Sequence, residues 1–183
     1  YLCYMKALET VKSIEAFQKI KELGGDISIV GGCVRDHFLN KESKDIDLII
    51  REIELEEIIN VLRNYGKVDQ VGESFGIVKF SPFGWTSEPF DIAQPRKDIL
   101  IDKSLGHHGI KAMFDSKIPL IDDLNRRDYT VNSIAVSWDG TIIDPFNGLE
   151  DIKNKKIRAT SKTAFIEDYL RAIRGIQFAS RFN

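Results

Sequence analysis

Two aspartates at alternate positions carry the side chains best suited to chemistry in this chain. Asp45 and Asp47 stand in the apolar segment "DIDLII" over residues 45–50. Alternate residues of a β-strand point to the same side, so the two carboxylates would project together while Ile46 and Leu48 face the core. Neighbouring carboxylates repel each other unless they share divalent cations, and Mg²⁺ accepts such oxygen ligands. The spacing therefore predicts a magnesium site.

A pair of glycines lies shortly before these aspartates. Gly31 and Gly32 separate the apolar segment 26–30 from residues that predict a short helix. Glycine lets a phosphate approach the backbone, and the N–H groups at the start of a helix attract an anion. Arg35, one turn into that helix, could bind the same phosphate through two hydrogen bonds.

Each feature alone has an ordinary structural interpretation. A glycine pair is usually only a turn, and alternating aspartates are usually a solvated strand end. A phosphate cradle beside a divalent-metal site, however, suits phosphoryl or nucleotidyl transfer, in which two metals stabilise the attacking and leaving oxygens. The combination at this spacing favours the functional interpretation.

Hydrophobic periodicity predicts the elements that position these residues. The first is an amphipathic helix over 8–22, with apolar residues at helical spacing: Leu8, Val11, Ile14, Phe17 and Ile20. Helices and strands then alternate, with a strand over 26–30, a helix over 33–39, a strand over 45–50, a helix over 54–66 and three strands between 68 and 95.

The second half of the chain is less regular. Residues 95–119 show no sustained period and contain His107 and His108, so they predict a long loop of the functional or mobile kind. The two histidines have no third metal ligand nearby in the sequence. Residues 122–137 are predicted to be helical, and residues 162–182 are predicted to form a last helix that ends without a cap.

The composition is that of an ordinary globular protein, because 43% of the 183 residues are hydrophobic and 30% are charged. The net charge of −2, from 26 basic and 28 acidic side chains, excludes a global basic field that holds nucleic acid. Contact with nucleic acid would be local, or made by a part of the protein outside this chain. Cys3 and Cys33 predict reduced thiols in a cytoplasmic protein, and no apolar run is long enough to span a membrane.

Four groups of residues resemble the motifs of one known family. They are "GGCVRD" over 31–36 followed by "DID" over 45–47, "RRDYTVNSIA" over 126–135, "DPFNG" over 144–148 and "EDYLR" over 167–171. In this order they are similar to the motifs of the class II tRNA nucleotidyltransferase and bacterial poly(A) polymerase family, within the polymerase-β-like superfamily. There they serve metal and phosphate binding, ribose recognition, the junction of head and neck, and reading of the incoming base.

The resemblance implies an α+β fold in two parts. Residues 1–148 would form the nucleotidyltransferase head, the catalytic domain, with a mixed sheet of about five strands flanked by helices. Residues 149–183 would begin a helical neck that carries the base-reading helix, and the neck would continue into domains outside this chain.

The resemblance also assigns roles around the transferred nucleotide. It implies that Asp45 and Asp47 are catalytic and bind two Mg²⁺ ions. One ion would activate the 3′-hydroxyl of the primer, and the other would hold the triphosphate of ATP or CTP as pyrophosphate leaves. The matching nucleotide-binding positions are Gly31, Gly32 and Arg35 for the phosphates, and Arg127 and Asp128 for the ribose.

The remaining assignments concern the base and a third carboxylate. Asp168 and Arg171, three residues apart on the predicted last helix, match the base-reading pair, and Arg174 would extend the same helix face. The ordinary alternative is a surface ion pair, which contributes little. Gln177 stands where many relatives have a third arginine of that helix. Asp91 is a candidate third metal ligand on a neighbouring strand, with a buried structural role as its alternative.

The predicted function is template-independent RNA nucleotidyl transfer, which adds CMP, AMP or both to tRNA 3′ ends with release of pyrophosphate. The partners would be nucleoside triphosphates and a tRNA 3′ end or other RNA primer, held mainly by domains outside this chain, with no membrane involved. Three alternatives stay open: a poly(A) polymerase of the same family, a non-catalytic RNA-binding module on this scaffold, and a transferase that acts on a small molecule or a protein.

Overall fold

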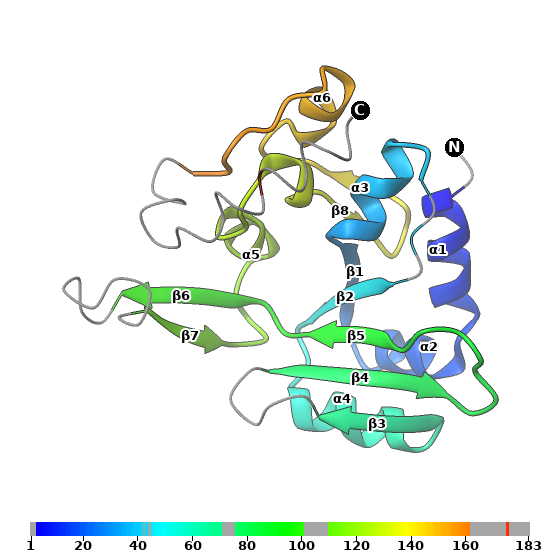
Figure 1. Ribbon diagram of the computed structural model, residues 1–183. Helices are drawn as coiled ribbons and strands as arrows, with labels where there is room; N and C mark the ends of the chain where they lie inside the picture. Colours follow the sequence, from blue (N-terminus) through cyan, green and yellow to red (C-terminus); the bar gives the residue numbers. More distant parts are fainter. Residues whose placement is uncertain are drawn as a thin grey trace.

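The computed structural model describes residues 3–41, 43, 45–70, 76–100, 110–161 and 175. Figure 1 shows a sheet with helices packed against it and a separate hairpin that extends to one side. The helices are α1 (Cys3–Ser13), α2 (Glu15–Glu22), α3 (Gly32–Phe38), α4 (Leu55–Arg63), α5 (Leu120–Asn125), the 3-10 helix η2 (Thr130–Asn132) and α6 (Gly148–Lys153). The strands are β1 (Asp26–Val30), β2 (Ile46–Arg51), β3 (Gly66–Gln70), β4 (Ile77–Pro82), β5 (Phe90–Ala93), β6 (Arg96–Leu100), β7 (Ile110–Phe114), β8 (Ala135–Ser137) and β9 (Ile142–Ile143).

Within the described residues, the main sheet has seven strands in the order β3-β4-β5-β2-β1-β8-β9, and β6 pairs with β7 in a second sheet. Strand β1 runs antiparallel to β2 and β8, whereas β2 runs parallel to β5. The sheet is therefore mixed, and the predicted α+β class is confirmed. Its longer strands, β1 to β5, correspond to the predicted five, and the short strands β8 and β9 extend one edge.

One face of the sheet packs against α2 and α4, which lie on the same side of it (Figure 1). Leu48 and Ile50 of β2 point to this side and are almost completely buried. Phe17 of α2 packs edge-on against Phe80 of β4 and Phe90 of β5, with ring centroids 5.7 and 5.2 Å apart. Burial of this apolar layer holds the central strands in place.

Helix α5 packs against part of the opposite face of the sheet. Val30 of β1 and Ile49 of β2 form a smaller buried cluster with Leu120 and Leu124 of α5. Asp47 lies two residues before Ile49 and therefore on the same face. The fold thus brings the residues that follow α5 toward the predicted catalytic strand.

The predicted helix over 8–22 is in fact two helices. Its apolar residues are buried as expected, but α1 ends at Ser13 and α2 begins at Glu15. Ile14 between them has an extended backbone, with a ψ of 117°, and a buried side chain. The break turns the chain, so that the apolar stripes of both helices reach the same core (Figure 1).

Within the predicted loop over 95–119, the structure has two strands, β6 and β7, so the prediction is wrong for these residues. The two strands pair antiparallel along their whole length. A clear alternating pattern is missing because a two-stranded ribbon buries little of its faces; Ile99 and Met113 are 45% and 41% exposed. Residues 101–109, which include both histidines of the predicted loop, lie outside the described residues.

The predicted helix over 122–137 is also wrong, because the segment divides into α5, the single turn η2 and strand β8. Ala135 of β8 pairs with Val30 of β1 in the main sheet. Strand β1 needs hydrogen-bond partners along this edge, and that tertiary pairing overrides the weak helical preference of the segment.

Of the predicted last helix over 162–182, Gly175 is described, and it is helical. The other residues of that helix, among them Asp168, Arg171 and Arg174, lie outside the described residues. Among the helices that the structure describes, none is long and apolar enough to cross a membrane.

Candidate active site

Gly31 forms a left-handed turn between β1 and α3 at which two functional side chains meet. Its φ of +77° is a backbone conformation that favours glycine. A Cβ atom at this position would lie 3.0 Å from Oδ2 of Asp47 and 3.3 Å from Nη1 of Arg127. Asp47 and Arg127, which belong to separate sequence motifs, therefore lie together at the glycine turn.

Asp47 belongs to a group of charged side chains on one face of the sheet. Asp91 of β5 stands directly opposite Asp47, and Lys79 of β4 stands directly opposite Asp91. Nζ of Lys79 lies 2.6 Å from Oδ1 of Asp91. Burial is the main reason that the pKa of Asp47 is raised, followed by the charge of Asp91. Asp45 adds to this effect, whereas Arg127 and Lys79 oppose it, so the charge of Asp47 is incompletely compensated.

The donor chemistry at Asp45 and Asp47 fits Mg²⁺. In the part of the chain that the structure describes, no three histidine, cysteine or acidic side chains gather closely enough to hold a metal by themselves. Mg²⁺ is usually held by one or two carboxylates, with water and substrate phosphates as further ligands, so two aspartates suffice. Burial raises the pKa of the Cys33 thiol to about 12, which keeps it neutral. Asp91 is bound to Lys79, and its part in metal binding stays a prediction.

Arg35 is buried, with 4% of its side chain exposed, and its guanidinium is bound within the protein. Its Nε and Nη2 atoms lie 2.8 and 2.7 Å from Oδ1 of Asp36, and Nη1 donates to Oδ1 of Asn132 at 2.6 Å. Arg35 thus ties α3 to η2 beside the glycine turn, and its contact with phosphate stays a prediction. A Cβ atom on Gly32 would lie 3.6 Å from Nη2 of Arg35.

Asp128 is held by groups of its own motif. Its Oδ1 accepts a hydrogen bond from the backbone N–H of Tyr129 at 2.8 Å and from Nδ2 of Asn132 at 3.0 Å. Asn132 therefore bridges Arg35 and Asp128, because its oxygen accepts from the first and its nitrogen donates to the second. This bridge connects the glycine motif with the motif that contains Asp128.

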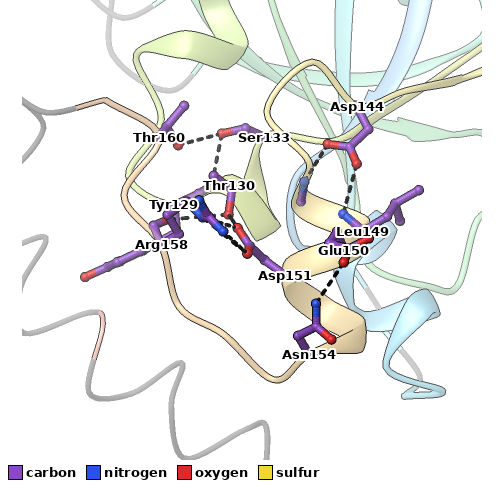
Figure 2. Close-up of polar contacts among 11 residues, drawn as sticks. Tyr129, Thr130, Ser133, Asp144, Leu149, Glu150, Asp151, Asn154, Arg158 and Thr160 are labelled. Atoms are coloured by element: carbon purple, nitrogen blue, oxygen red, sulfur yellow. Dashed lines mark hydrogen bonds and ion pairs between the residues drawn. The ribbon is translucent and has the colours of Figure 1, made fainter.

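A second polar network joins the same motif to the residues after α6, as Figure 2 shows. Asp151 of α6 is 1% exposed, and it accepts hydrogen bonds from Oγ1 of Thr130 at 2.7 Å and from Nε of Arg158 at 3.0 Å. Nη2 of Arg158 donates to the other carboxylate oxygen at 3.1 Å. The hydroxyls of Ser133 and Thr160 lie 3.0 Å apart. The segment after α6 is thereby held along the "RRDYT" motif.

Gly175, the residue that follows the predicted base-reading group, lies against the same motif. A Cβ atom at this position would lie 2.2 Å from the hydroxyl oxygen of Tyr129, which leaves no room for a side chain. Gly175 therefore lies against the side chain of Tyr129.

Three residues around the site have no functional signal of their own in the sequence. Asn132 lies four positions after Asp128, a spacing that could have indicated a contact had a helical turn been expected there. Lys79 and Asp123 become recognisable only from strand register and from burial, which sequence patterns do not report.

Alanine in place of Gly31 is expected to weaken binding of CTP by the complete protein about tenfold or more, equivalent to about 1.4 kcal/mol, because its methyl group would stand where a phosphate approaches the backbone. The added methyl group would also separate Asp47 from Arg127. Gly84→Ala is the matched control, because Gly84 has a φ of +76° and no atom within 4 Å of an added Cβ. We expect the control to lose similar stability in urea unfolding while its dissociation constant for CTP stays unchanged. Equal losses of binding in both variants would contradict this geometry.

The mixed sheet, the glycine turn after β1 and the aspartates at β2 define the head of a nucleotidyltransferase. The profile of the family described as Poly A polymerase head domain matches residues 27–158. The chain belongs to this family.

Individual relatives agree with this assignment. The Multifunctional CCA protein of Psychromonas ingrahamii is 35% identical over 156 residues, which are 85% of this chain and 35% of that protein. A crystal structure of the Bacillus stearothermophilus CCA-adding enzyme in complex with CTP has a TM-score of 0.73 and 28% identity, over 98% of this chain and 40% of that one. An apo form of a CCA-adding enzyme has a TM-score of 0.81 and 27% identity, and the match covers 97% of this chain and 40% of that one. The chain thus spans 34% to 38% of the length of three curated relatives that it matches.

Proposed function

We propose that the complete protein is a template-independent RNA nucleotidyltransferase, which adds CMP, AMP or both to the 3′ ends of tRNA from CTP and ATP. The observation that carries this proposal is the meeting of Asp47 and Arg127 at the Gly31 turn. An acidic strand residue, a guanidinium and an open backbone at one point suit a nucleoside triphosphate with its metal ion. Relatives named for CCA addition support tRNA as the primer.

The residues of the chain bind and orient the triphosphate in this proposal. The backbone at Gly31 and Gly32 admits the phosphates, because no side chain stands in their way. Arg127 places positive charge at the same turn, which favours the bound nucleotide. Asp128 accepts a hydrogen bond from a ribose hydroxyl, a group that a deoxyribonucleotide lacks.

Asp45 and Asp47 would hold the Mg²⁺ ions, with Asp91 as a third candidate ligand. When bound, Mg²⁺ supplies Lewis-acid stabilisation of the attacking and leaving oxygens. The incompletely compensated charge of Asp47 supports a cation at this place. Lys79 keeps one positive charge beside Asp91, so that the acidic group is partly neutralised even without a metal ion.

Further parts of the proposal concern the rest of the chain. Asp168, Arg171 and Arg174 read the incoming base, so that protein side chains replace a nucleic-acid template. Residues 1–148 form the head and residues 149–183 begin the neck, with α6 as the joint between them. The proposed compartment is the cytoplasm, where tRNA and nucleoside triphosphates occur together.

A poly(A) polymerase of the same family is the second candidate, and the description of the matching family favours it. Both activities would use the same head residues and the same chemistry. They differ in the primer and in whether addition stops after a fixed number of nucleotides.

The test offers the complete protein Mg²⁺ and tRNAs that lack their last three, two or one nucleotides, with CTP and ATP supplied separately. Sequencing of the products distinguishes addition of CMP, addition of AMP and open-ended poly(A) synthesis. We expect addition that stops at a completed CCA end and that is lost when a chelator removes Mg²⁺. Nucleotide binding without incorporation into any primer would support the non-catalytic alternative and contradict the proposal.

A further inference from the structure

Asp123 of α5 is a completely buried carboxylate that the chemistry described above does not use. Its Oδ1 accepts hydrogen bonds from Nε and Nη2 of Arg126 at 2.9 and 2.7 Å, and from the backbone N–H of Arg96 at 3.1 Å. Its Oδ2 accepts from Nε and Nη2 of Arg127 at 3.3 and 3.1 Å. One buried carboxylate therefore binds two consecutive arginines and the backbone of a third residue.

These contacts determine the direction in which Arg127 points. A guanidinium is planar, so binding its Nε and Nη2 atoms to one carboxylate oxygen fixes the plane of the group. The remaining nitrogen, Nη1, is the atom that lies 3.3 Å from the position of an added Cβ on Gly31. Asp123 thus holds one edge of Arg127 while the opposite edge faces the turn shared with Asp47.

The same carboxylate also contacts the β6–β7 hairpin. Arg96, whose N–H binds Asp123, is the first residue of β6. The next residue, Lys97, pairs with Asp122 of α5 at 2.6 Å. Asp123 therefore lies at the junction of the hairpin base and the arginine of the glycine turn. A buried ion pair is a poor means of gaining stability compared with apolar packing, so an arrangement this specific indicates a geometric role.

We propose that Asp123 is a positioning residue for nucleotide binding, which fixes Arg127 with Nη1 at the Gly31 turn and ties it to the base of the β6–β7 hairpin. The inference rests on the proposed function, because it takes Arg127 as a ligand of the triphosphate or ribose. Neutralising Asp123 releases Arg127 and weakens nucleotide binding, although Asp123 itself lies too deep to touch the nucleotide.

The experiment compares Asp123→Asn with the unchanged complete protein by equilibrium binding of CTP and ATP and by steady-state incorporation. We expect the dissociation constants and KM to rise about tenfold, equivalent to about 1.4 kcal/mol, while kcat changes much less. In an Arg127→Ala background, Asp123→Asn is expected to have no further effect on binding, because the group that it positions is already gone. Additive losses in the two variants would overturn the proposal.

Asp151→Asn is the matched control, since Asp151 is another buried carboxylate that binds an arginine, Arg158. We expect a fall in melting temperature similar to that of Asp123→Asn and an unchanged dissociation constant for CTP. Equal weakening of binding by Asp151→Asn, or unchanged binding by Asp123→Asn, would overturn the positioning role. If the Asp123→Asn protein does not fold, the Asp123→Glu protein is measured instead. Glutamate keeps the charge but moves the carboxylate, so we expect the same weakening of nucleotide binding. If the unchanged complete protein binds neither CTP nor ATP, the proposed function itself is wrong. This result differs from a failure of the positioning role, in which the unchanged protein binds nucleotide and the Asp123 variant binds it equally well.

Discussion

Asparagine in place of Asp47 is expected to lower nucleotide incorporation by the complete protein about 10³-fold or more, the scale on which lost electrostatic stabilisation of a transition state acts. The substitution keeps the size of the side chain and removes the charge that would bind Mg²⁺ beside the Gly31 turn. Steady-state incorporation into a tRNA primer measures the loss.

The stability of the Asp47→Asn protein is expected to stay the same or to rise. Burial and the charge of Asp91 raise the pKa of Asp47 in the folded state, so the folded protein holds this proton more tightly than the unfolded chain. Ionised Asp47 therefore opposes folding at pH values above its folded pKa, and that effect disappears in acid. Thermal unfolding of both proteins at pH 7 and in acid measures the difference.

Glu22→Gln serves as the control for this prediction. Glu22 ends α2, is 66% exposed and pairs with Lys19 at 3.0 Å. We expect unchanged incorporation, because the same change from acid to amide is made on a helix that packs against the other face of the sheet. Full activity of the Asp47→Asn protein would show that Asp47 is not catalytic. A large loss of stability would indicate that Asp47 is a structural carboxylate instead.

Alanine in place of Arg158 is expected to lower the free energy of unfolding by about 3 kcal/mol. The side chain of Arg158 is 53% exposed, but its partner Asp151 is 1% exposed, so the substitution leaves a buried carboxylate without its cation. Asp151→Ala is expected to cost less, about 2 kcal/mol, because Arg158 can return to water and the main loss is the hydrogen bond with Thr130. Urea unfolding followed by circular dichroism measures both values.

Lys156→Ala provides the comparison, since Lys156 is an exposed cation two residues before Arg158. Surface substitutions of this kind change the free energy of unfolding by about 0.5 kcal/mol or less. If Arg158→Ala is no more destabilising than Lys156→Ala, the network in Figure 2 does not hold the segment after α6 to the head.

The catalytic strand was accessible from the sequence because its signals are local. The alternation of Asp45 and Asp47 with apolar residues is visible within six letters, and β2 begins one residue after the predicted start. The turn at Gly31 is equally local, because its φ of +77° and ψ of −138° are a backbone conformation that strongly favours glycine. Strand β1 has the predicted bounds, and α3 begins and ends one residue before its predicted limits.

The residues that surround the catalytic strand could not be predicted from local sequence patterns. Asp91 and Lys79 stand beside Asp47 because β5 and β4 join the sheet in a particular register, and register depends on packing across the whole sheet. Asp123 looks like any acidic residue in the first turn of a short helix. Its role becomes visible only in the folded chain, where α5 packs against the sheet and the carboxylate of Asp123 is buried. There it binds the side chains of Arg126 and Arg127 and the backbone of Arg96.

The sequence by itself determined the β1–α3–β2 unit, the glycine turn and the pair of aspartates, because backbone preference and side-chain alternation depend on neighbours a few residues away. Only the tertiary structure decided that Arg127 meets Asp47, that residues 96–100 pair with residues 110–114, and that residues 122–137 end in a strand. Those outcomes depend on which distant segments share a buried face and which strand edge needs hydrogen-bond partners, and contacts of that kind exist only in the folded chain.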